Sequence, residues 1–204
     1  EPMKRYTSFQ IGGPADVLVE PRDVEHLQTV LKWAWSEGLP VFVLGNGTNL
    51  LVADEGIRGV VVRIGQGLDD ISFEGECVRA GAGVALPTLA RECAERGFAG
   101  LEWAVGIPGS LGGALTMNAG AYSHTVGDVT REVRMIGLDA AFSVKTGEEM
   151  QFAQRSSRLS HGDVIAYQAL LALRHADPDE IRARTEGYMK DRKIKQPLHM
   201  PSAG

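Results

Sequence analysis

Two glycine-rich segments hold the groups in this sequence that are best suited to bind a ligand. The first, Gly45–Val52, reads Gly-Asn-Gly-Thr-Asn-Leu-Leu-Val and directly follows the apolar run Val41–Leu44. Glycines just past the carboxyl end of a strand let backbone N–H groups approach an anion closely, and Asn and Thr side chains add donors. The spacing is neither that of a dinucleotide-binding Gly-x-Gly-x-x-Gly turn nor that of a P-loop. The segment predicts a phosphate cradle, or else a tight turn without a ligand.

The second segment, Gly106–Tyr122, has five glycines within fifteen residues, interleaved with Ser110, Thr116 and Asn118. Such a composition is costly to order, so we expect neither a regular helix nor a strand core here. Apolar side chains between the glycines favour a packed segment over a flexible loop. We expect this segment to form a wall against which a large planar or phosphorylated ligand lies.

Two clusters of cations lie further along the chain. Arg155 and Arg158 flank two serines and could bind a carboxylate or phosphate bidentately; the alternative is a solvated turn. Lys190–Lys195 holds four cations in six residues. They could meet an anionic ligand, or they could simply complement the negative end of a helix macrodipole.

The sequence lacks the residue patterns of a metal site and of a nucleophilic catalytic site. The five histidines, at 26, 124, 161, 175 and 199, have no paired metal-ligand spacing, and no Cys-x-x-Cys occurs, so we expect no metal site. There is no Gly-x-Ser-x-Gly nucleophile elbow either. Without an evident nucleophile or base, the glycine-rich segments favour binding of a large cofactor over catalysis by side chains alone.

The composition is that of a folded domain. The chain has 204 residues, 44% hydrophobic and 23% charged, with 25 glycines. A net charge of −5 disfavours a nucleic-acid or anionic-membrane partner, and apolar runs of four to six residues are too short to span a bilayer. No signal peptide precedes Glu1, so we expect a cytoplasmic protein. Cys77 and Cys93 are expected to be reduced core residues.

The first part of the chain predicts a β-α-β unit. Val17–Val19 is the first strand, and a helix from about Val24 to Glu37 follows, with Asp23 as its N-cap and a stop at Gly38. The continuous apolar runs Val41–Leu44 and Val60–Val62 predict strands that are buried on both faces. The polar stretch from Gly65 to Gly75 is the expected boundary between two lobes.

The second part repeats the alternation of strand and helix. We expect strands at Cys77–Ala80, Val129–Ile136 and Val164–Leu173, and a helix at Leu86–Arg96. A last helix starts at Asp177 and runs to about Lys195, before Pro197. Its apolar content is thin, so we expect it to pack against something outside this chain or to span between lobes.

These segments, taken in order, resemble the UDP-N-acetylenolpyruvoylglucosamine reductase family, also called UDP-N-acetylmuramate dehydrogenases. The resemblance covers essentially the whole chain, and the Gly106–Tyr122 block is its most specific part. The matching segments are Tyr6–Asp16, Gly45–Val52, Gly81–Gly83, Gly106–Tyr122, Arg155–Arg158, and Lys195–Pro197 with Pro201–Gly204.

The resemblance implies an α+β fold of the vanillyl-alcohol-oxidase/p-cresol-methylhydroxylase type, with two α/β lobes that hold non-covalent FAD. The expected divisions are residues 1–64, residues 65–176, and a helix and linker at 177–204 that lead into a substrate domain. The pyrophosphate would lie on the Gly45–Leu50 amides and the isoalloxazine along the second segment. The implied FAD contacts are Gly45, Asn46, Gly47, Thr48, Asn49, Leu50, Ile107, Pro108, Gly109, Ser110, Gly113, Asn118, Gly120 and Ala121.

The resemblance also implies the reaction. NADPH reduces the flavin and leaves, and the enolpyruvyl UDP-sugar then takes a hydride from flavin N5, a step of peptidoglycan synthesis. Arg155 matches the family arginine that contacts the substrate carboxylate and stabilises the developing enolate. Lys195 and Arg192 match basic positions that meet the nucleotide diphosphate. The partners implied are these small molecules, with no nucleic acid and no membrane, for a monomeric protein.

Two departures from the family pattern bear on function. Gln154 stands where the family usually has Tyr, and the sequence stops at Gly204, one residue before the family's Ser or Cys proton donor. We therefore expect the FAD-binding lobes without the proton donor. The alternatives are a flavin-binding module without catalysis of its own, and another oxidase of the same fold, which should lack the Lys-Gln-Pro and Pro-Ser-Ala-Gly runs.

Overall fold

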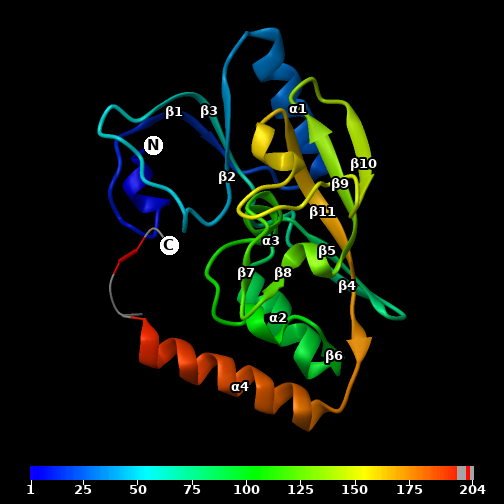
Figure 1. Ribbon diagram of the computed structural model, residues 1–204. Helices are drawn as coiled ribbons and strands as arrows, with labels where there is room; N and C mark the ends of the chain where they lie inside the picture. The colour runs from blue at the N-terminus through cyan, green and yellow to red at the C-terminus, as the bar shows by residue number, and fades with distance from the viewer. Residues whose placement is uncertain (197–200, 203–204) are drawn as a thin grey trace.

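Two main β-sheets follow one another along the described chain, beside two short two-stranded sheets (Figure 1). The computed structural model describes residues 1–196 and 201–202. The first sheet is parallel, has the order β1-β3-β2, and consists of β1 (Ala15–Val19), β2 (Val41–Leu44) and β3 (Ile57–Arg63). The second is antiparallel, has the order β10-β9-β11-β5-β4, and consists of β4 (Ile71–Glu74), β5 (Cys77–Gly81), β9 (Thr130–Gly137), β10 (Phe142–Thr146) and β11 (Val164–Ala172).

Helix α1 (Val24–Ser36) connects β1 to β2, as predicted. The Asp23 carboxylate caps it by accepting from the His26 backbone N–H at 2.6 Å, and Gly38 terminates it with a left-handed φ of +64°. Its buried face belongs to one cluster with Val60 and Val62 of β3 and the apolar side chains of the second sheet. The two sheets therefore share a core, and the predicted boundary between two lobes stays a prediction.

Strand β2 differs from its prediction. It lies at the edge of the first sheet, and the side chain of Val43 is 38% exposed although Leu44 is buried. The prediction of a strand buried on both faces was wrong for Val41–Leu44 and is confirmed for Val60–Val62, all three of which are fully buried in the central strand β3. An apolar run does not reveal whether a strand has one neighbour or two, and that number decides its burial.

The other face of the first sheet is covered by the N-terminal residues. Met3 is fully buried there and packs with Ala15, Leu44, Val52 and Val61. The N-terminal segment is thereby anchored beside the loop that follows β2.

The second sheet confirms the strands predicted for this part of the chain. Helix α2 (Leu86–Glu95) carries Pro87 in its first turn and is followed by Gly97 at φ +77°. The stretch from Gly65 to Gly75 is less irregular than predicted, because it contains β4, which pairs with β5 in a hairpin. The remaining short elements are η1 (Met3–Arg5), β6 (Phe98–Ala99), η2 (Glu102–Ala104), α3 (Leu111–Thr116), β7 (Gly120–Ala121), β8 (His124–Thr125), η3 (Val126–Asp128), η4 (Arg158–His161) and β12 (Arg174–His175).

Both cysteines are free thiols. Cys93 is fully buried on α2, and this burial raises the pKa of its thiol to about 12. Cys77 is half-buried in β5, which corrects the expectation that it is a core residue. The reduced state predicted for the two cysteines is confirmed.

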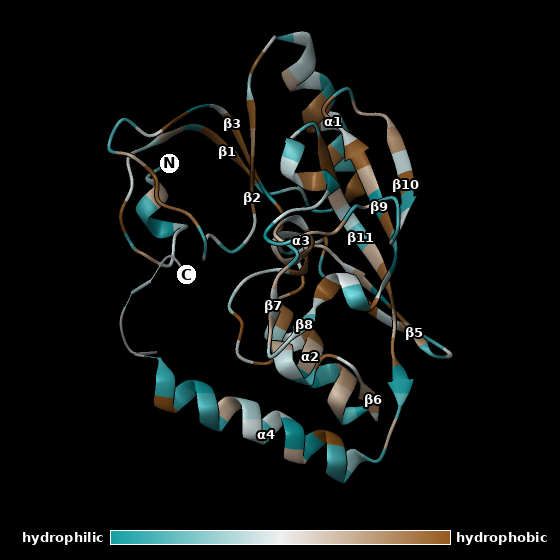
Figure 2. Ribbon diagram, in the orientation of Figure 1, coloured by the Kyte–Doolittle hydropathy of each residue, from teal (hydrophilic) through white to brown (hydrophobic). Residues whose placement is uncertain are grey.

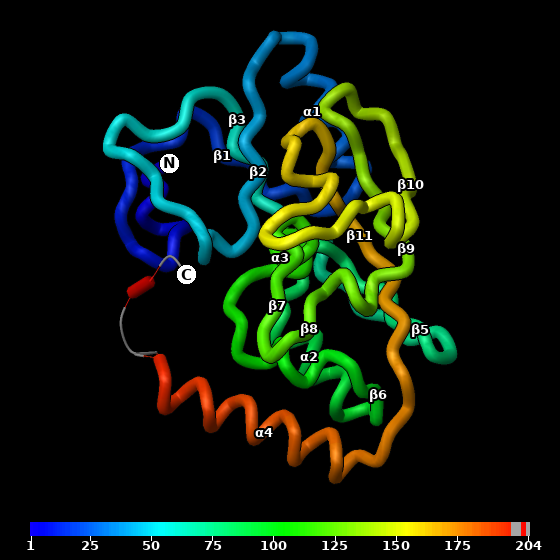
Figure 3. The backbone as a smooth tube through the Cα atoms, viewed as in Figure 1, coloured from blue at the N-terminus to red at the C-terminus, as the bar shows by residue number. Residues whose placement is uncertain are grey.

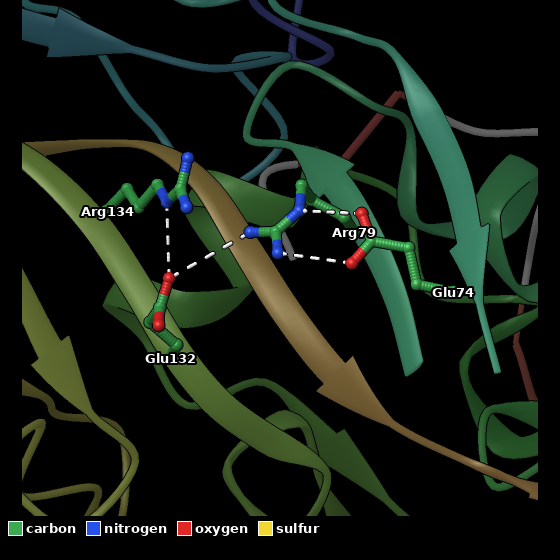
Figure 4. A network of polar contacts seen from close by, with 4 residues as sticks. All are labelled: Glu74, Arg79, Glu132 and Arg134. Atoms are coloured by element: carbon green, nitrogen blue, oxygen red, sulfur yellow. Dashed lines mark hydrogen bonds and ion pairs between the residues drawn. The ribbon is translucent and has the colours of Figure 1, made fainter. Parts of the chain in front are cut away.

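The outer face of the second sheet carries a network of ion pairs (Figure 4). Arg79 of β5 pairs with Glu74 of the neighbouring β4 at 3.1 Å and reaches across β11 to within 3.9 Å of Glu132 on β9. Arg134 pairs with the same glutamate at 3.2 Å. Pairs of this kind link strands and contribute little individually, so we assign this network to sheet cohesion.

Helix α4 (Pro178–Lys195) begins as predicted, with the Asp177 carboxylate accepting from the backbone N–H groups of Asp179 and Glu180. Most of it is hydrophilic (Figure 2). It nevertheless packs within this chain, on α2 and η2: Ile181 is fully buried, Tyr188 packs against the main core, and Arg184 pairs with the buried Glu102 at 3.0 Å. Helix α4 therefore has packing partners within this chain, and the expected packing against something outside the chain stays a prediction.

The described end of the chain returns to the N-terminal region (Figure 3). The Ser8 hydroxyl donates to the Ser202 carbonyl oxygen at 2.5 Å. Pro197, His199, Ala203 and Gly204 lie outside the described residues. Among the residues that are described, no helix combines the length and the apolar character needed to cross a membrane.

Candidate functional site

The loop after β2 presents a run of unpaired backbone amides. From Gly45 to Val52, none of the backbone N–H groups donates a hydrogen bond to any other residue in the described part of the chain. Gly47 and Val52 are nonetheless buried. Because these N–H groups have no partner among the described residues and successive N–H groups of a turn can converge on an anion, this run is suited to an acceptor-rich ligand such as a phosphate group.

The N-terminal segment determines the shape of this loop. Gly47 has a left-handed φ of +63°, and a Cβ at this position would overlap the Tyr6 carbonyl oxygen. The Ser8 backbone N–H donates to the Gly47 carbonyl oxygen at 3.0 Å, and the Gly13 N–H donates to that of Ala53 at 3.0 Å. The chemistry of its residues did not identify the N-terminal segment as a support for this loop, although Tyr6–Asp16 was among the segments that resemble the reductase family.

The two glycine-rich segments lie against each other. The Thr48 hydroxyl donates to the Pro108 carbonyl oxygen at 3.3 Å. A Cβ on Gly45 would overlap the Ser110 hydroxyl oxygen, and one on Gly109, where φ is +127°, would lie 3.1 Å from the Thr48 hydroxyl oxygen. At both positions the backbone meets a side-chain hydroxyl of the facing segment, and glycine leaves room for that oxygen. The structure thus brings the predicted cradle and the predicted wall into contact.

The wall contains a helix, contrary to the prediction. Helix α3 spans Leu111–Thr116, and the Ser110 hydroxyl caps it by accepting from the Gly113 backbone N–H at 3.3 Å. The Gly112 N–H donates to the Ala82 carbonyl oxygen at 2.8 Å, and a Cβ on Gly112 would lie 3.1 Å from that of Ala82. Two of the glycines are therefore helical, and Gly112 lets the helix lie directly on the chain that follows β5.

Asn118 connects the wall to the loop that carries Arg155. Its side-chain carbonyl accepts from the Gly127 backbone N–H at 3.1 Å, and its amide donates to the Ala153 carbonyl oxygen at 3.1 Å. Its backbone has a φ of +42°. The side chain of this predicted cofactor residue is thus engaged within the protein, whereas Gly120 and Ala121 form the adjacent short strand β7.

Arg155 is exposed and has a left-handed φ of +56°. Within the described residues, its guanidinium forms no hydrogen bond or ion pair. Strained conformations of non-glycine residues persist where the surrounding structure imposes them, often at functional sites. Arg155 is therefore presented with its full donor capacity, as a bidentate anion ligand requires.

Arg158 does not share this role. Its two terminal nitrogens donate to the two carboxylate oxygens of Asp163, each at 2.6 Å. Of the two interpretations given for these arginines, Arg158 fits the turn without a ligand, because its partner five residues later already satisfies the guanidinium fork.

The Arg158–Asp163 pair predicts a pH dependence. Its hydrogen bonds lower the pKa of the Asp163 carboxyl from 3.8 to about 2. A lowered pKa in the folded state stabilises the fold above the unfolded value, and that stabilisation is lost as the pH falls from 3.8 towards about 2. Asp163→Asn should therefore melt below the wild type at neutral pH, and the gap should close over this acidic range. Asp54→Asn is the control, because Asp54 is exposed and forms no ion pair with the described residues. The difference in melting temperature between this variant and the wild type should not change in this way over the same pH range.

The basic end of α4 lies beside the wall. Ala121, Tyr122, Asp191, Arg192, Lys195 and Gln196 line a hollow of about 220 Å³. The Arg192 side chain lies over Gly106, where a Cβ would overlap it, and its buried Nε forms no hydrogen bond to the described residues. Lys195 pairs with Asp191 at 2.8 Å. Sequence reasoning missed Tyr122 and Asp191 as neighbours of these two cations; the i, i+4 spacing of Asp191 and Lys195 was the available signal.

A larger hollow of about 470 Å³ lies elsewhere, beside α1, and is lined by Ala34, Trp35, Gly38, Leu39, Pro40, Val41 and Leu138. It contains none of the predicted site residues and lacks the convergent polar groups typical of a cofactor site. Within the described ranges, no group of three or more His, Cys, Asp or Glu side chains is arranged to hold a metal ion.

Comparisons with known proteins agree with this geometry. The FAD binding domain family matches residues 15–139. The UDP-N-acetylenolpyruvoylglucosamine reductases of Syntrophomonas wolfei and Alkaliphilus oremlandii are 44% and 41% identical over 204 residues, which are 100% of this chain and 68% and 67% of theirs. The chain thus spans about two thirds of the length of these relatives.

Solved structures confirm the predicted fold. UDP-N-acetylenolpyruvylglucosamine reductase (MurB) from Thermus caldophilus aligns with a TM-score of 0.85 and 37% identity over 100% of this chain and 71% of its own. A Phl p 4 variant, a glucose oxidase, aligns with a TM-score of 0.59 over 79% of this chain and 35% of its own, and at 14% identity it shows the fold alone. The chain belongs to the UDP-N-acetylenolpyruvoylglucosamine reductase family, the flavoprotein reductases of peptidoglycan synthesis.

Proposed function

We propose that the loop Gly45–Leu50 holds the pyrophosphate of FAD on its backbone amides. The single observation that carries this assignment is the run of N–H groups from Gly45 to Val52 that donates to none of the described residues. The close approach of Gly45 to the Ser110 hydroxyl and of Gly109 to the Thr48 hydroxyl supports it, because the loop is thereby held directly against the second glycine-rich segment. The residues present fit the group.

The isoalloxazine would lie along Ile107–Ser110 and the Asn118–Ala121 turn. When bound, FAD supplies the hydride-carrying centre, N5, that the side chains of this protein lack. The protein's own contribution is to shape the site: Asn118 ties the turn to the Arg155 loop through the Ala153 carbonyl, and the buried Ser110 caps α3. The proposed cofactor contacts remain those predicted from the sequence, with Gly113 contributing through α3.

Arg155 is proposed to bind the carboxylate of the enolpyruvyl UDP-sugar and to stabilise negative charge that develops next to it. Its exposed guanidinium, free of partners in the described chain, supports this role. Arg192 and Lys195, which line the hollow beside the wall, are proposed to meet the substrate diphosphate. NADPH is the proposed source of the reducing equivalents.

The test is a titration of the flavin-stripped protein with FAD. We expect a visible flavin spectrum that is perturbed on binding and a melting temperature that rises with FAD concentration. NADPH should then bleach the bound flavin under anaerobic conditions. Absence of FAD binding would contradict the assignment of the cradle, and flavin that binds but is not reduced by NADPH would favour a module without catalysis of its own.

A further inference from the structure

Asp191 lies between two hydrogen-bond donors, Tyr122 and Lys195, in the hollow of about 220 Å³ at the end of α4. Its carboxylate accepts from the Tyr122 hydroxyl at 2.9 Å and pairs with the Lys195 ammonium at 2.8 Å. The Tyr122 ring lies 4.4 Å from that of Tyr188, centroid to centroid, so the phenol is supported by the same helix. Two donors from separate segments thus converge on one anionic group.

The charges in the hollow favour this arrangement. The hydrogen bonds from Lys195 and then from Tyr122 lower the pKa of the Asp191 carboxyl, so Asp191 is ionised at neutral pH. The second cationic side chain of the hollow, Arg192, retains a buried Nε without a partner among the described residues. The Asp191 carboxylate therefore neutralises Lys195, one of the two cations of the hollow. It occupies the position from which a phosphate oxygen would accept hydrogen bonds from the Lys195 ammonium and the Tyr122 hydroxyl.

We propose that Asp191 is an internal competitor for the phosphate-binding position and that a diphosphate ligand must displace it from Lys195 and Tyr122. The inference rests on the proposed function, which brings the substrate diphosphate to Arg192 and Lys195. A competing carboxylate weakens the binding of every anion. It disfavours ligands of low negative charge most, because these cannot replace the ion pair that they disrupt. Asp191 thus raises the charge that a ligand needs in order to bind.

The test compares UDP affinities of the FAD-loaded protein and its Asp191→Asn variant. Asn keeps the size of the side chain and an oxygen that accepts from Tyr122, but removes the charge. Removing the exposed ion pair, together with relief of repulsion towards the phosphates, should make UDP binding about three- to tenfold tighter. Calorimetry or the flavin difference spectrum gives the dissociation constant.

Two controls isolate the mechanism. Glu186→Gln removes the same charge from an exposed position on α4 and should change UDP affinity by less than about twofold, because screened surface charges act weakly at a distance. In a Lys195→Met background, Asp191→Asn should give a smaller gain than in the wild type, because the competition for the ammonium has been removed.

The outcomes separate the two proposals. If the wild type binds UDP and Asp191→Asn binds it equally or more weakly, Asp191 positions Lys195 and does not compete with the ligand, and the inference is overturned while the proposed function stands. If the wild type does not bind UDP, the diphosphate assignment of Arg192 and Lys195 fails, and the inference fails with it.

Discussion

Replacing Gly47 by alanine should lower the affinity for FAD by at least about 100-fold, the equivalent of losing two charge-assisted hydrogen bonds of about 1.5 kcal/mol each. A Cβ at this position would overlap the Tyr6 carbonyl oxygen. Since that oxygen belongs to the braced N-terminal segment, the loop has to move, and its amides would leave the positions from which they can converge on a pyrophosphate. Fluorescence quenching of FAD on titration gives the dissociation constant.

Gly38→Ala is the matched control for this variant. Gly38 has a φ of +64°, close to the +63° of Gly47, but nothing lies within 4 Å of the position of its Cβ. Both variants impose left-handed strain of about 1–2 kcal/mol on an alanine, and only Gly47→Ala adds the overlap. Gly38→Ala should melt at a lower temperature than the wild type and bind FAD normally. Equal FAD affinities for the two variants would show that the loop is not the cradle.

Replacing Arg155 by glutamine should lower kcat for reduction of the enolpyruvyl substrate by about 100- to 1000-fold, the effect of removing one donor that stabilises a developing oxyanion. The prediction follows from its place in the site. The guanidinium is exposed and has no protein partner within the described chain, so its removal breaks no internal ion pair and should leave the fold intact.

Arg155→Lys separates charge from geometry. Lysine restores the positive charge but not the planar pair of donors, so its kcat should lie between those of the wild type and Arg155→Gln. Arg131→Gln, at an exposed arginine of β9, serves as the control and should keep full activity. Steady-state kinetics with NADPH measures all three in FAD-loaded protein that is extended through the family's proton donor and substrate domain, and wild-type kcat in Arg155→Gln would refute the assignment.

The helix termini were predictable because their signals are local. Asp23 and Asp177 each accept hydrogen bonds from backbone N–H groups two or three residues later, and Gly38 adopts the left-handed conformation that ends α1. These interactions depend on residues that are adjacent in sequence, so composition and spacing suffice to identify them. The ion pair of Asp191 with Lys195, four residues apart on one helix, was also local and could have been inferred.

The exposure of β2 and the helix within the glycine-rich wall were not predictable from local sequence. Whether Val43 is buried depends on which strands pair with β2, and α3 is tolerated because Gly112 can lie against Ala82, thirty positions earlier. Contacts between residues so distant in sequence leave no periodic pattern. The need for a small residue at one position arises from the backbone and side chain of another segment.

The sequence by itself determined the kinds of groups available for function: glycine-rich runs with free amides, an arginine beside serines, and a cationic helix end. Only the tertiary structure decided which of them act together. It placed Thr48 against Pro108, brought Arg192 over Gly106, and removed Arg158 from the site through Asp163. The physical reason is that ligand binding requires several donors to converge in space, and convergence depends on how sheets and helices pack, which hydrogen-bonding capacity alone does not specify.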